Sequence, residues 1–316
     1  MLKYVSGRIA QAVIVLWAAF TVSFVVLYLL PGDPAEILLS QSAGEGGTIS
    51  PAQLAKVRHE YGLDQPVLVQ YLHQLVNALH FDFGQSISKG QPVSALLAQN
   101  IPPTLALAAF ALGLTVVLGV VLAFLATFVQ VRWLRRLLER LPAVGVSLPT
   151  FFVGLLLIQL FSFTLRWFPA AGTDGVATLV LPAVTMALPT SGILAQVLIR
   201  SLNDTLGEAY VTTARAKGLG RVVIHLKHAF KNAALPALTI LGLLFGATIT
   251  QAVVAETVFS RIGVGRLAQQ AVLAQDIPIV QGVVVIAAAL FVGINLIVDL
   301  IYPLLDPRVA RTPRVA

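Results

Sequence analysis

The chain contains no cysteine and unusually little charge. Without cysteine it can form no disulfide, no thiolate metal site and no cysteine nucleophile. Only 11% of its 316 residues are charged, whereas about 25% are charged in an average soluble domain. Water solvates such a chain poorly, so the composition argues against an ordinary soluble protein.

Signatures of catalysis are also missing. The sequence has no GxxxxGK[ST] phosphate-binding loop, no HExxH motif and no GxSxG nucleophile elbow. The pairs His73/His80 and His225/His228 are spaced to share a helix face, but no third or fourth metal ligand accompanies either pair. We therefore expect that the chain is not an enzyme, holds no metal and binds no cofactor of its own.

Apolar sequence is abundant. Hydrophobic residues make up 57% of the chain and occur in long runs, and a membrane helix needs about 20 such residues to cross a hydrocarbon layer roughly 30 Å thick. Six runs are long enough. They predict an all-α polytopic membrane protein with six transmembrane helices in one domain. The predicted spans are residues 9–30, 104–129, 143–165, 177–199, 235–260 and 279–301.

The positive charges lie between these runs. With the N-terminus placed inside, the inside loops hold 15 of the 21 Lys and Arg residues and the outside loops hold 6. Cytoplasmic loops carry an excess of Lys and Arg, so both termini are predicted to be cytoplasmic. Because the net charge of +7 gathers at the ends of the spans, it indicates a lipid membrane as partner and not nucleic acid.

The first span is predicted to be a retained anchor helix. Lys3 and Arg8 precede it, as basic residues do in a signal peptide. Its uncharged run is longer than a usual signal-peptide core, however, and the sequence from Leu30 to Asp33 is no small-x-small cleavage site.

The segment after the first span, residues 31–100, is too long for a turn and is predicted to form an extracytoplasmic cap. Residues 51–61 and 67–79 show the patterns of short amphipathic helices. Ser50 is the expected N-cap of the first of these, with Pro51 at the first helical position.

The longest cytoplasmic loop, residues 200–234, carries two amphipathic pieces. Thr205 and Glu208 fit a capping box that opens a short helix. Gly218 stands where the C-terminal cap of this helix needs a positive φ. Residues 221–231 form the second piece, so the loop is predicted to be a helix-turn-helix. From these residues alone, a basic connector lying along the membrane surface remains the alternative.

Two motifs in this loop resemble a known family. The sequences EAYVTTARAKG, residues 208–218, and HAFKNA, residues 228–233, resemble the EAA loop of binding-protein-dependent ABC importer permeases, in its dipeptide and oligopeptide branch. Ile262 departs from the pattern, since the family often has proline before Gly-x-Gly. Further family-like pieces follow in order along nearly the whole chain: residues 31–34, 61–66, 81–86, 103–105, 147–150, 256–260, 263–267 and 306–308.

The resemblance implies the architecture of a type I ABC importer permease. In that family the short helix of the loop is a coupling helix, which docks in a cleft of an ATPase subunit. The same role is implied here for the helix and its glycine stop. The residues concerned are Glu208, Ala209, Tyr210, Thr213, Ala214, Arg215, Lys217 and Gly218.

The resemblance also implies a complex in the bacterial inner membrane. Its other members would be a homologous second permease, two ATPase subunits that bind ATP and Mg²⁺, and an extracytoplasmic substrate-binding protein. This chain would form half of a translocation path for dipeptides or oligopeptides. The permease motifs do not encode the cargo, so nickel, glutathione or haem remains an alternative.

Polar residues on the fifth predicted span are the candidates for the path. Hydroxyl side chains also bond across helices, and an acid near a span end can be solvated or packed between helices, so these alternatives stay open. The candidates are Thr248, Thr250, Gln251 and Glu256.

Two other classes of protein remain as alternatives. A self-sufficient channel or secondary carrier would transport without ATP, although the two halves of the chain show no repeat of the kind expected in such carriers. A membrane scaffold without a path would tolerate polar substitutions on the fifth span.

Overall fold

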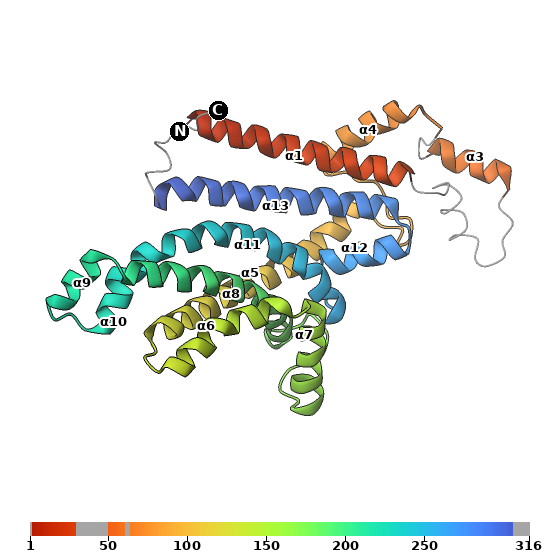
Figure 1. Ribbon diagram of the computed structural model, residues 1–316. Coiled ribbons are helices and arrows are strands. Elements are labelled where there is room, and N and C mark those ends of the chain that lie inside the picture. The colour runs from red at the N-terminus through yellow and green to blue at the C-terminus, as the bar shows by residue number, and fades with distance from the viewer. Residues whose placement is uncertain (1, 30–49, 61–63, 306–316) are drawn as a thin grey trace. The chain divides into compact units, whose positions relative to one another are not determined.

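The computed structural model describes residues 2–29, 50–60 and 64–305 (Figure 1). Within these ranges the chain is helical, with no strand beyond one isolated bridge between Gln85 and Pro92. Five of the described helices are long and apolar enough to cross a membrane, and there are six crossings if one bent pair counts as a span. The prediction of an all-α, multi-span protein is confirmed.

The chain divides into two compact units. The first contains Pro103–Ile262 and the chain from Ile294 onward, and the second contains Leu2–Pro102 and Gly263–Gly293.

The helices in chain order are α1 (Leu2–Leu29), α3 (Pro51–Glu60), α4 (Val67–Leu79), α5 (Val93–Phe128), α6 (Arg132–Ser147), α7 (Thr150–Leu157), the π-helical η1 (Ile158–Thr164), α8 (Ala177–Leu206), α9 (Ala209–Ala216), α10 (Arg221–Val223), the π-helical η2 (Ile224–Ala229), α11 (Phe230–Val258), α12 (Val264–Leu273) and α13 (Ile277–Leu305).

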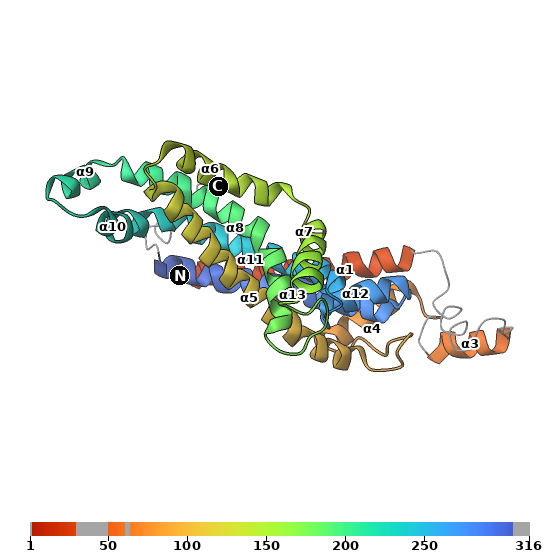
Figure 2. The same cartoon turned by 90° about the horizontal axis from the view of Figure 1, so that it is seen from below.

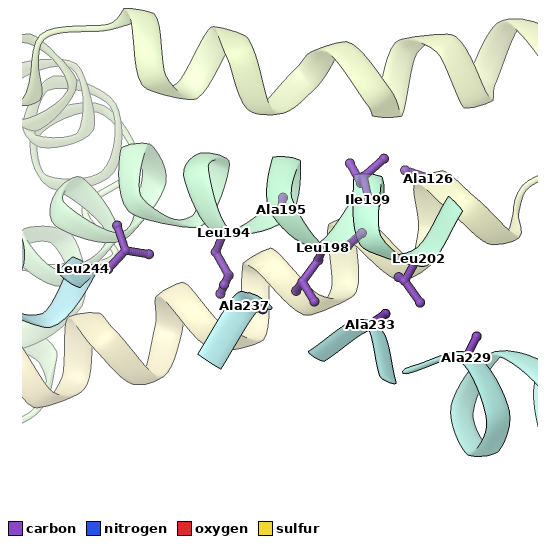
Figure 3. Close-up of a cluster of buried hydrophobic side chains, with 11 residues drawn as sticks. Ala126, Leu194, Ala195, Leu198, Ile199, Leu202, Ala229, Ala233, Ala237 and Leu244 are labelled. Carbon is purple, nitrogen blue, oxygen red and sulfur yellow. The ribbon is translucent and has the colours of Figure 1, made fainter. Parts of the chain in front are cut away.

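The first unit is built around α8, which packs against both α11 and α6. Figures 1 and 2 show α8 and α11 side by side. Small residues let helix backbones approach closely, and alanines and leucines make up most of the cluster that these helices share with α5 (Figure 3). Its buried members are Ala123, Ala126, Leu194, Ala195, Leu198, Ile199, Leu202, Ala229, Ala233, Ala237 and Leu244.

The approach of α6 to α8 depends on Gly192. A Cβ atom added at this position would lie 2.6 Å from the backbone oxygen of Pro142 in α6. Real Cβ atoms do not come that close to a backbone oxygen, so any side chain at Gly192 would push the two helices apart.

The third predicted span, residues 143–165, is not one helix. α6 ends at Ser147, α7 begins at Thr150, and the chain bends by 101° between them. Leu148 and Pro149 have extended backbone, with ψ angles of 130° and 131°. Proline disfavours the helical conformation in the residue before it, which explains the break at Leu148.

Several predicted helix ends are wrong because charge ends an apolar run without ending a helix. α8 continues past residue 199 to Leu206, and α10, η2 and α11 form one helix from Arg221 to Val258. The predicted loop, residues 200–234, therefore shrinks to α9 and its short connections. α5 begins at Val93, inside the segment predicted as cap.

In the second unit, α4 packs on α1 through Tyr71. The Tyr71 hydroxyl lies 2.9 Å from Thr21 Oγ1, and the ring lies 5.7 Å and 5.4 Å from the ring centroids of Phe20 and Phe24. A second cluster joins the start of α5 to α12 and α13. Its buried members are Val93, Leu96, Leu97, Val264, Leu267, Ala271, Ile279, Val283 and Ile286.

The two helices predicted for the segment after the first span are confirmed as α3 and α4. Ser50 caps α3 as predicted, because its Oγ accepts a hydrogen bond from the backbone N–H of Ala52 at 3.3 Å. In return, Gln53 Oε1 accepts one from the backbone N–H of Ser50 at 3.1 Å, which completes a capping box. Residues 31–49 lie outside the described part of the chain.

Asp276, at the start of α13, binds the segment between α4 and α5. Its buried Oδ2 accepts hydrogen bonds from Ser86 Oγ at 2.6 Å and from the backbone N–H and Oγ of Ser88 at 2.8 and 2.7 Å. Ser86 ends a family-like motif, residues 81–86, whereas no motif includes Asp276.

The hydrogen bonds decide the ionisation of Asp276. Burial by itself raises the pKa of this carboxyl, but the bonds from Ser86, Ser88 and Ile279 outweigh burial, and the pKa lies below its ordinary value. A carboxyl whose pKa is lowered by folding stabilises the fold above its unfolded-state pKa. That stabilisation is lost as the pH falls through the folded-state pKa.

Asp276→Asn is expected to lower the free energy of unfolding by about 1 to 3 kcal/mol at neutral pH, because buried donors lose a charged acceptor. The difference from the parent should shrink as the pH falls below about 4. Thermal melting of the purified protein at several pH values measures both effects. Asp174→Asn, at an exposed carboxyl, is the control, and equal melting temperatures for Asp276→Asn and the parent would contradict the role assigned to Asp276.

Candidate functional site

Helix α9 contains most of the predicted coupling residues. Figures 1 and 2 show it at one end of the α8 and α11 pair. The N-cap is Glu208, which has extended backbone and makes no capping hydrogen bond with its side chain. The predicted capping box is therefore wrong. Thr205 lies in the last turn of α8, which ends at Leu206 with Gly207 as its C-cap.

The C-terminal end of α9 is as predicted. Gly218 has a φ of +78°, a conformation that glycine adopts at no steric cost. The backbone N–H of Gly218 donates to Arg215 O at 2.9 Å, and that of Leu219 donates to Ala214 O at 3.3 Å. This pair of bonds is a Schellman motif, which satisfies the last carbonyl groups of the helix and turns the chain back toward Arg221.

One face of α9 packs inside the loop. Val211 and Ala214 are 0% and 7% exposed and form a cluster with Ile224 of η2 and Leu206 of α8. Among the eight predicted coupling residues only Ala214 faces inward, so its contribution is to packing. The other seven are exposed: Glu208, Ala209, Tyr210, Thr213, Arg215, Lys217 and Gly218.

Tyr210 fastens α9 to the base of α11. Its hydroxyl donates a hydrogen bond to His228 O at 3.2 Å and accepts one from Asn232 Nδ2 at 2.9 Å. Together with the buried cluster, these bonds attach the short helix to both α8 and α11. α9 is therefore an exposed element with a fixed position relative to two long helices.

The four predicted path residues do not share one face of α11. Thr248 is buried and donates its hydroxyl to Leu244 O at 2.7 Å, whereas Thr250 is exposed. Gln251 is half-buried, and its Oε1 is buried without a hydrogen-bond partner within the described residues. Glu256 is fully buried. Of the four, only Thr250 is exposed.

Glu256 joins α11 to α5. Its Oε1 accepts a hydrogen bond from Thr104 Oγ1 at 2.5 Å, and its side chain is 0% exposed. The neighbouring cluster of Leu107, Ala183 and Ala255 adds apolar contacts between α5, α8 and α11. The helix-packing alternative is therefore the one the structure shows for Glu256.

Arg261, which sequence reasoning did not select, holds the connection between η1 and α8 against the end of α11. The guanidinium is 2% exposed, and Nη1 donates to Gly172 O, Thr178 O and Thr178 Oγ1 at 3.0, 2.8 and 2.9 Å. Burial lowers the pKa of Arg261, while the charge of nearby Glu256 opposes that effect. The only signal in the sequence was the position of Arg261 between two family-like pieces.

Ile262 adds a bond to the same connection. Its backbone N–H donates to Thr173 Oγ1 at 2.9 Å. A proline in this place, as the family often has, would carry no N–H. The departure from the family pattern at Ile262 therefore supplies one hydrogen bond between the end of α11 and the segment before α8.

Several apolar spans, with a short helix exposed at one end of two of them, define a class of protein: a polytopic membrane protein. The family profile described as "Binding-protein-dependent transport system inner membrane component" matches residues 115–311. A profile for the N-terminal part of such membrane components matches residues 1–108. The chain belongs to this family, and it is an inner membrane component of a binding-protein-dependent transport system.

Relatives of nearly the same length support this assignment. A protein of Brucella abortus named for a peptide transport system permease is 38% identical over 98% of this chain and 99% of its own length. The glutathione transport system permease protein GsiC of Salmonella typhimurium is 36% identical, with the same coverage.

The fold is that of type I ABC importer permeases. An inward-facing structure of the MetNI methionine ABC transporter aligns with a TM-score of 0.57 and 16% identity, over 67% of this chain and 96% of the other. A likeness at this level of identity concerns the fold and not the cargo.

Gly218→Val is expected to destabilise the end of α9 by about 1 to 2 kcal/mol, because a β-branched residue is strained at positive φ. Amide hydrogen exchange of Ala214 to Leu219 should accelerate, while exchange in α8 and α11 stays the same. Gly220→Ala is the matched control, since Gly220 has a φ of −64°. Unchanged protection of Gly218 and Leu219 in the valine variant would refute the cap.

Arg261→Lys is expected to lower the melting temperature even though the charge is kept. The lysine ammonium lies about where the guanidinium carbon of arginine lies, so it falls short of the three acceptors that Nη1 reaches. A lost hydrogen bond to a charged group costs about 1.5 to 3 kcal/mol. Arg166→Lys, at an exposed arginine of the same connection, should melt like the parent. Equal melting of all three proteins would show that the bonds of Nη1 contribute nothing.

Proposed function

We propose that this chain is a permease subunit of an ATP-dependent importer that takes up peptides delivered by an extracytoplasmic substrate-binding protein. The observation that carries the proposal is the exposed helix α9, attached to α8 and α11 and ended by Gly218, in a chain of this family. Such a helix can transmit motion to α8 and α11 when a partner subunit binds to it.

The coupling step follows from the attachments of α9. A partner ATPase that closes on ATP would move α9 as a rigid body. The cluster around Val211 and the bonds of Tyr210 would pass that motion to α8 and α11, because packed elements shift as units and do not deform continuously. Exposed charges such as Glu208, Arg215 and Lys217 would set the docking register more than the affinity.

The translocation path is proposed to run along α11. Thr250 is exposed and Gln251 is half-buried, and these two are the residues proposed to face the cargo. Thr248 and Glu256 lie in the interior and would reach the cargo only after the helices separate. Substituting Thr250 or Gln251 should therefore affect transport more directly than substituting Thr248 or Glu256.

The proposed assembly contains a homologous second permease and two ATPase subunits. ATP and Mg²⁺ would bind to the ATPases, and this chain would bind no cofactor and perform no chemistry. Both termini and α9 would face the cytoplasm, since the positive charges gather at that end of the spans.

Peptide is the proposed cargo because the Brucella relative is named for peptide transport and the YVxTARAKG form of α9 resembles the same branch. Glutathione is the second candidate, because GsiC is nearly as similar over the same length. Glutathione is itself a small peptide, so one type of path could serve both.

The test is to purify this subunit gently from its native membrane, identify the co-purifying chains by mass spectrometry, and reconstitute the assembly in liposomes. We expect a second permease, ATPase subunits, and uptake of labelled dipeptides and oligopeptides that requires ATP and the binding protein. Glutathione, added as competitor and as labelled cargo, separates the two candidates.

Gly218→Val serves as the coupling control in the same assay. It should insert into the membrane and retain the sister permease, yet lose ATPase subunits or cargo-stimulated ATP hydrolysis. Gly220→Ala should behave like the parent. Solute transport by the lone chain without ATP would overturn the proposal in favour of a carrier.

A further inference from the structure

A cavity of about 440 Å³ lies beside α9, in the first unit of the chain. Its volume is in the range of sites that hold small molecules, about 300 to 1,000 Å³. The residues around it come from the ends of α5 and α8, from α6, and from the chain after α9. The polar and charged ones are Thr127, Arg135, Asn203, Arg215, Arg221 and His225, with no acidic side chain in this lining.

Each of the three arginines makes hydrogen bonds that leave other N–H groups available. Arg215 Nη2 donates to Leu206 O at 3.4 Å. Arg221 Nη2 donates to Phe128 O at 2.8 Å, and its guanidinium carbon lies 4.8 Å from the centre of the Phe128 ring. Arg135 bonds to Asn203 Oδ1 at 3.3 Å and pairs with Glu139 at 2.9 Å. Since a guanidinium has five N–H donors, these arginines can still bind an anion.

His225 provides an independent sign of a ligand. The residue is 4% exposed, its Nδ1 lies 3.0 Å from Arg221 O, and its ring stands edge-on to those of Phe124 and Phe128. Its Nε2 is buried and has no hydrogen-bond partner within the described residues. Since Arg221 O can only accept, Nδ1 carries the proton and Nε2 of the neutral ring is an acceptor. A buried acceptor without a partner is unfavourable, so a donor for Nε2, such as a hydroxyl group of a ligand, is expected in the cavity.

We propose that this cavity binds a phosphate group, and that the phosphate is carried by the headgroup of an anionic phospholipid. Guanidinium groups match phosphate oxygens in geometry as well as in charge. The site lies at the ends of α5 and α8, where the proposed orientation places the negatively charged cytoplasmic leaflet.

Exposed apolar residues next in sequence to the cavity residues Arg221, Ile224 and His225 favour a lipid over free phosphate. Val222, Val223 and Leu226 are 50%, 42% and 55% exposed and belong to the same helical stretch as Arg221 and His225. A phospholipid offers acyl chains to such side chains and its phosphate to the arginines. Inorganic phosphate could bind to the arginines but has no apolar part to contact these side chains.

The purified assembly in phosphatidylcholine nanodiscs that contain phosphatidylglycerol tests the site. Native mass spectrometry after release into detergent counts the phosphatidylglycerol molecules retained by each complex. Arg135→Gln with Arg221→Gln should weaken retention roughly 30-fold, because each arginine near a lipid surface contributes about 1 kcal/mol. Arg135→Gln alone, which changes an exposed side chain, should give an intermediate loss without affecting the fold.

The matched control is Arg136→Gln with Arg140→Gln, which removes the same charge from exposed positions of α6 that do not line the cavity. Retention by this variant should equal that of the parent. Equal retention by both double variants would overturn the proposal.

Two further outcomes would also count against a lipid. Free phosphate would be the ligand if the variant with Arg135→Gln and Arg221→Gln retains as much lipid as the parent, while inorganic phosphate binds tightly to the parent and not to that variant. Loss of ATPase subunits from the cavity variant, with lipid retention unchanged, would instead identify the cavity as part of a protein docking face.

Discussion

The close packing of α8 against α11 is the constraint on which the rest of the first unit depends. The two helices are joined along their length by alanines and leucines and are tied together near both ends. At one end Tyr210 of α9, which follows α8, bonds to His228 and Asn232 at the base of α11. At the other, Arg261 after α11 bonds to Gly172 and to Thr178 in the first turn of α8. A displacement of α9 would therefore be transmitted to the Arg261 end by two packed helices together and not by one helix alone.

The fold class and the C-terminal end of α9 could be predicted because they depend on local chemistry. Apolar runs as long as a bilayer is thick leave few alternatives to helices, and the turn after α9 requires a positive φ that Gly218 supplies. The same applies to Ser50, whose capping role needs only its neighbours in sequence. Helix ends beyond the apolar runs were less predictable, since α8 continues past Arg200 to Leu206 although its apolar run has ended. Pro149 marks the bend between α6 and α7, although the apolar run around it predicts a single span, residues 143–165.

The candidate site was predictable in part for the same reason. A motif identifies the exposed residues of α9. Thr205, in contrast, is predicted to cap α9 but lies in the last turn of α8, because the residue types of a capping box can also occur at the end of the preceding helix. The environments of Glu256, Arg261 and Asp276 depend on partners far away in the sequence: Thr104, Thr178 and the serines at 86 and 88. The hydrophobic periodicity of a sequence does not identify such partners, so the role of a buried charged residue cannot be assigned until its hydrogen-bond donor or acceptor is known.

The π-helical stretch η2 has a consequence for which side of α11 faces outward. A π-helical turn holds one residue more between hydrogen-bonded groups than an α-helical turn. Every residue after it is therefore rotated by about 100° around the axis, relative to an uninterrupted α-helix that starts at Arg221. The angular phase of α11, with Thr248 turned inward and Thr250 outward, is thus set by one inserted residue several turns away. In evolutionary terms, a single-codon insertion or deletion between Ile224 and Ala229 would change which side chains of α11 face outward without altering any residue of α11.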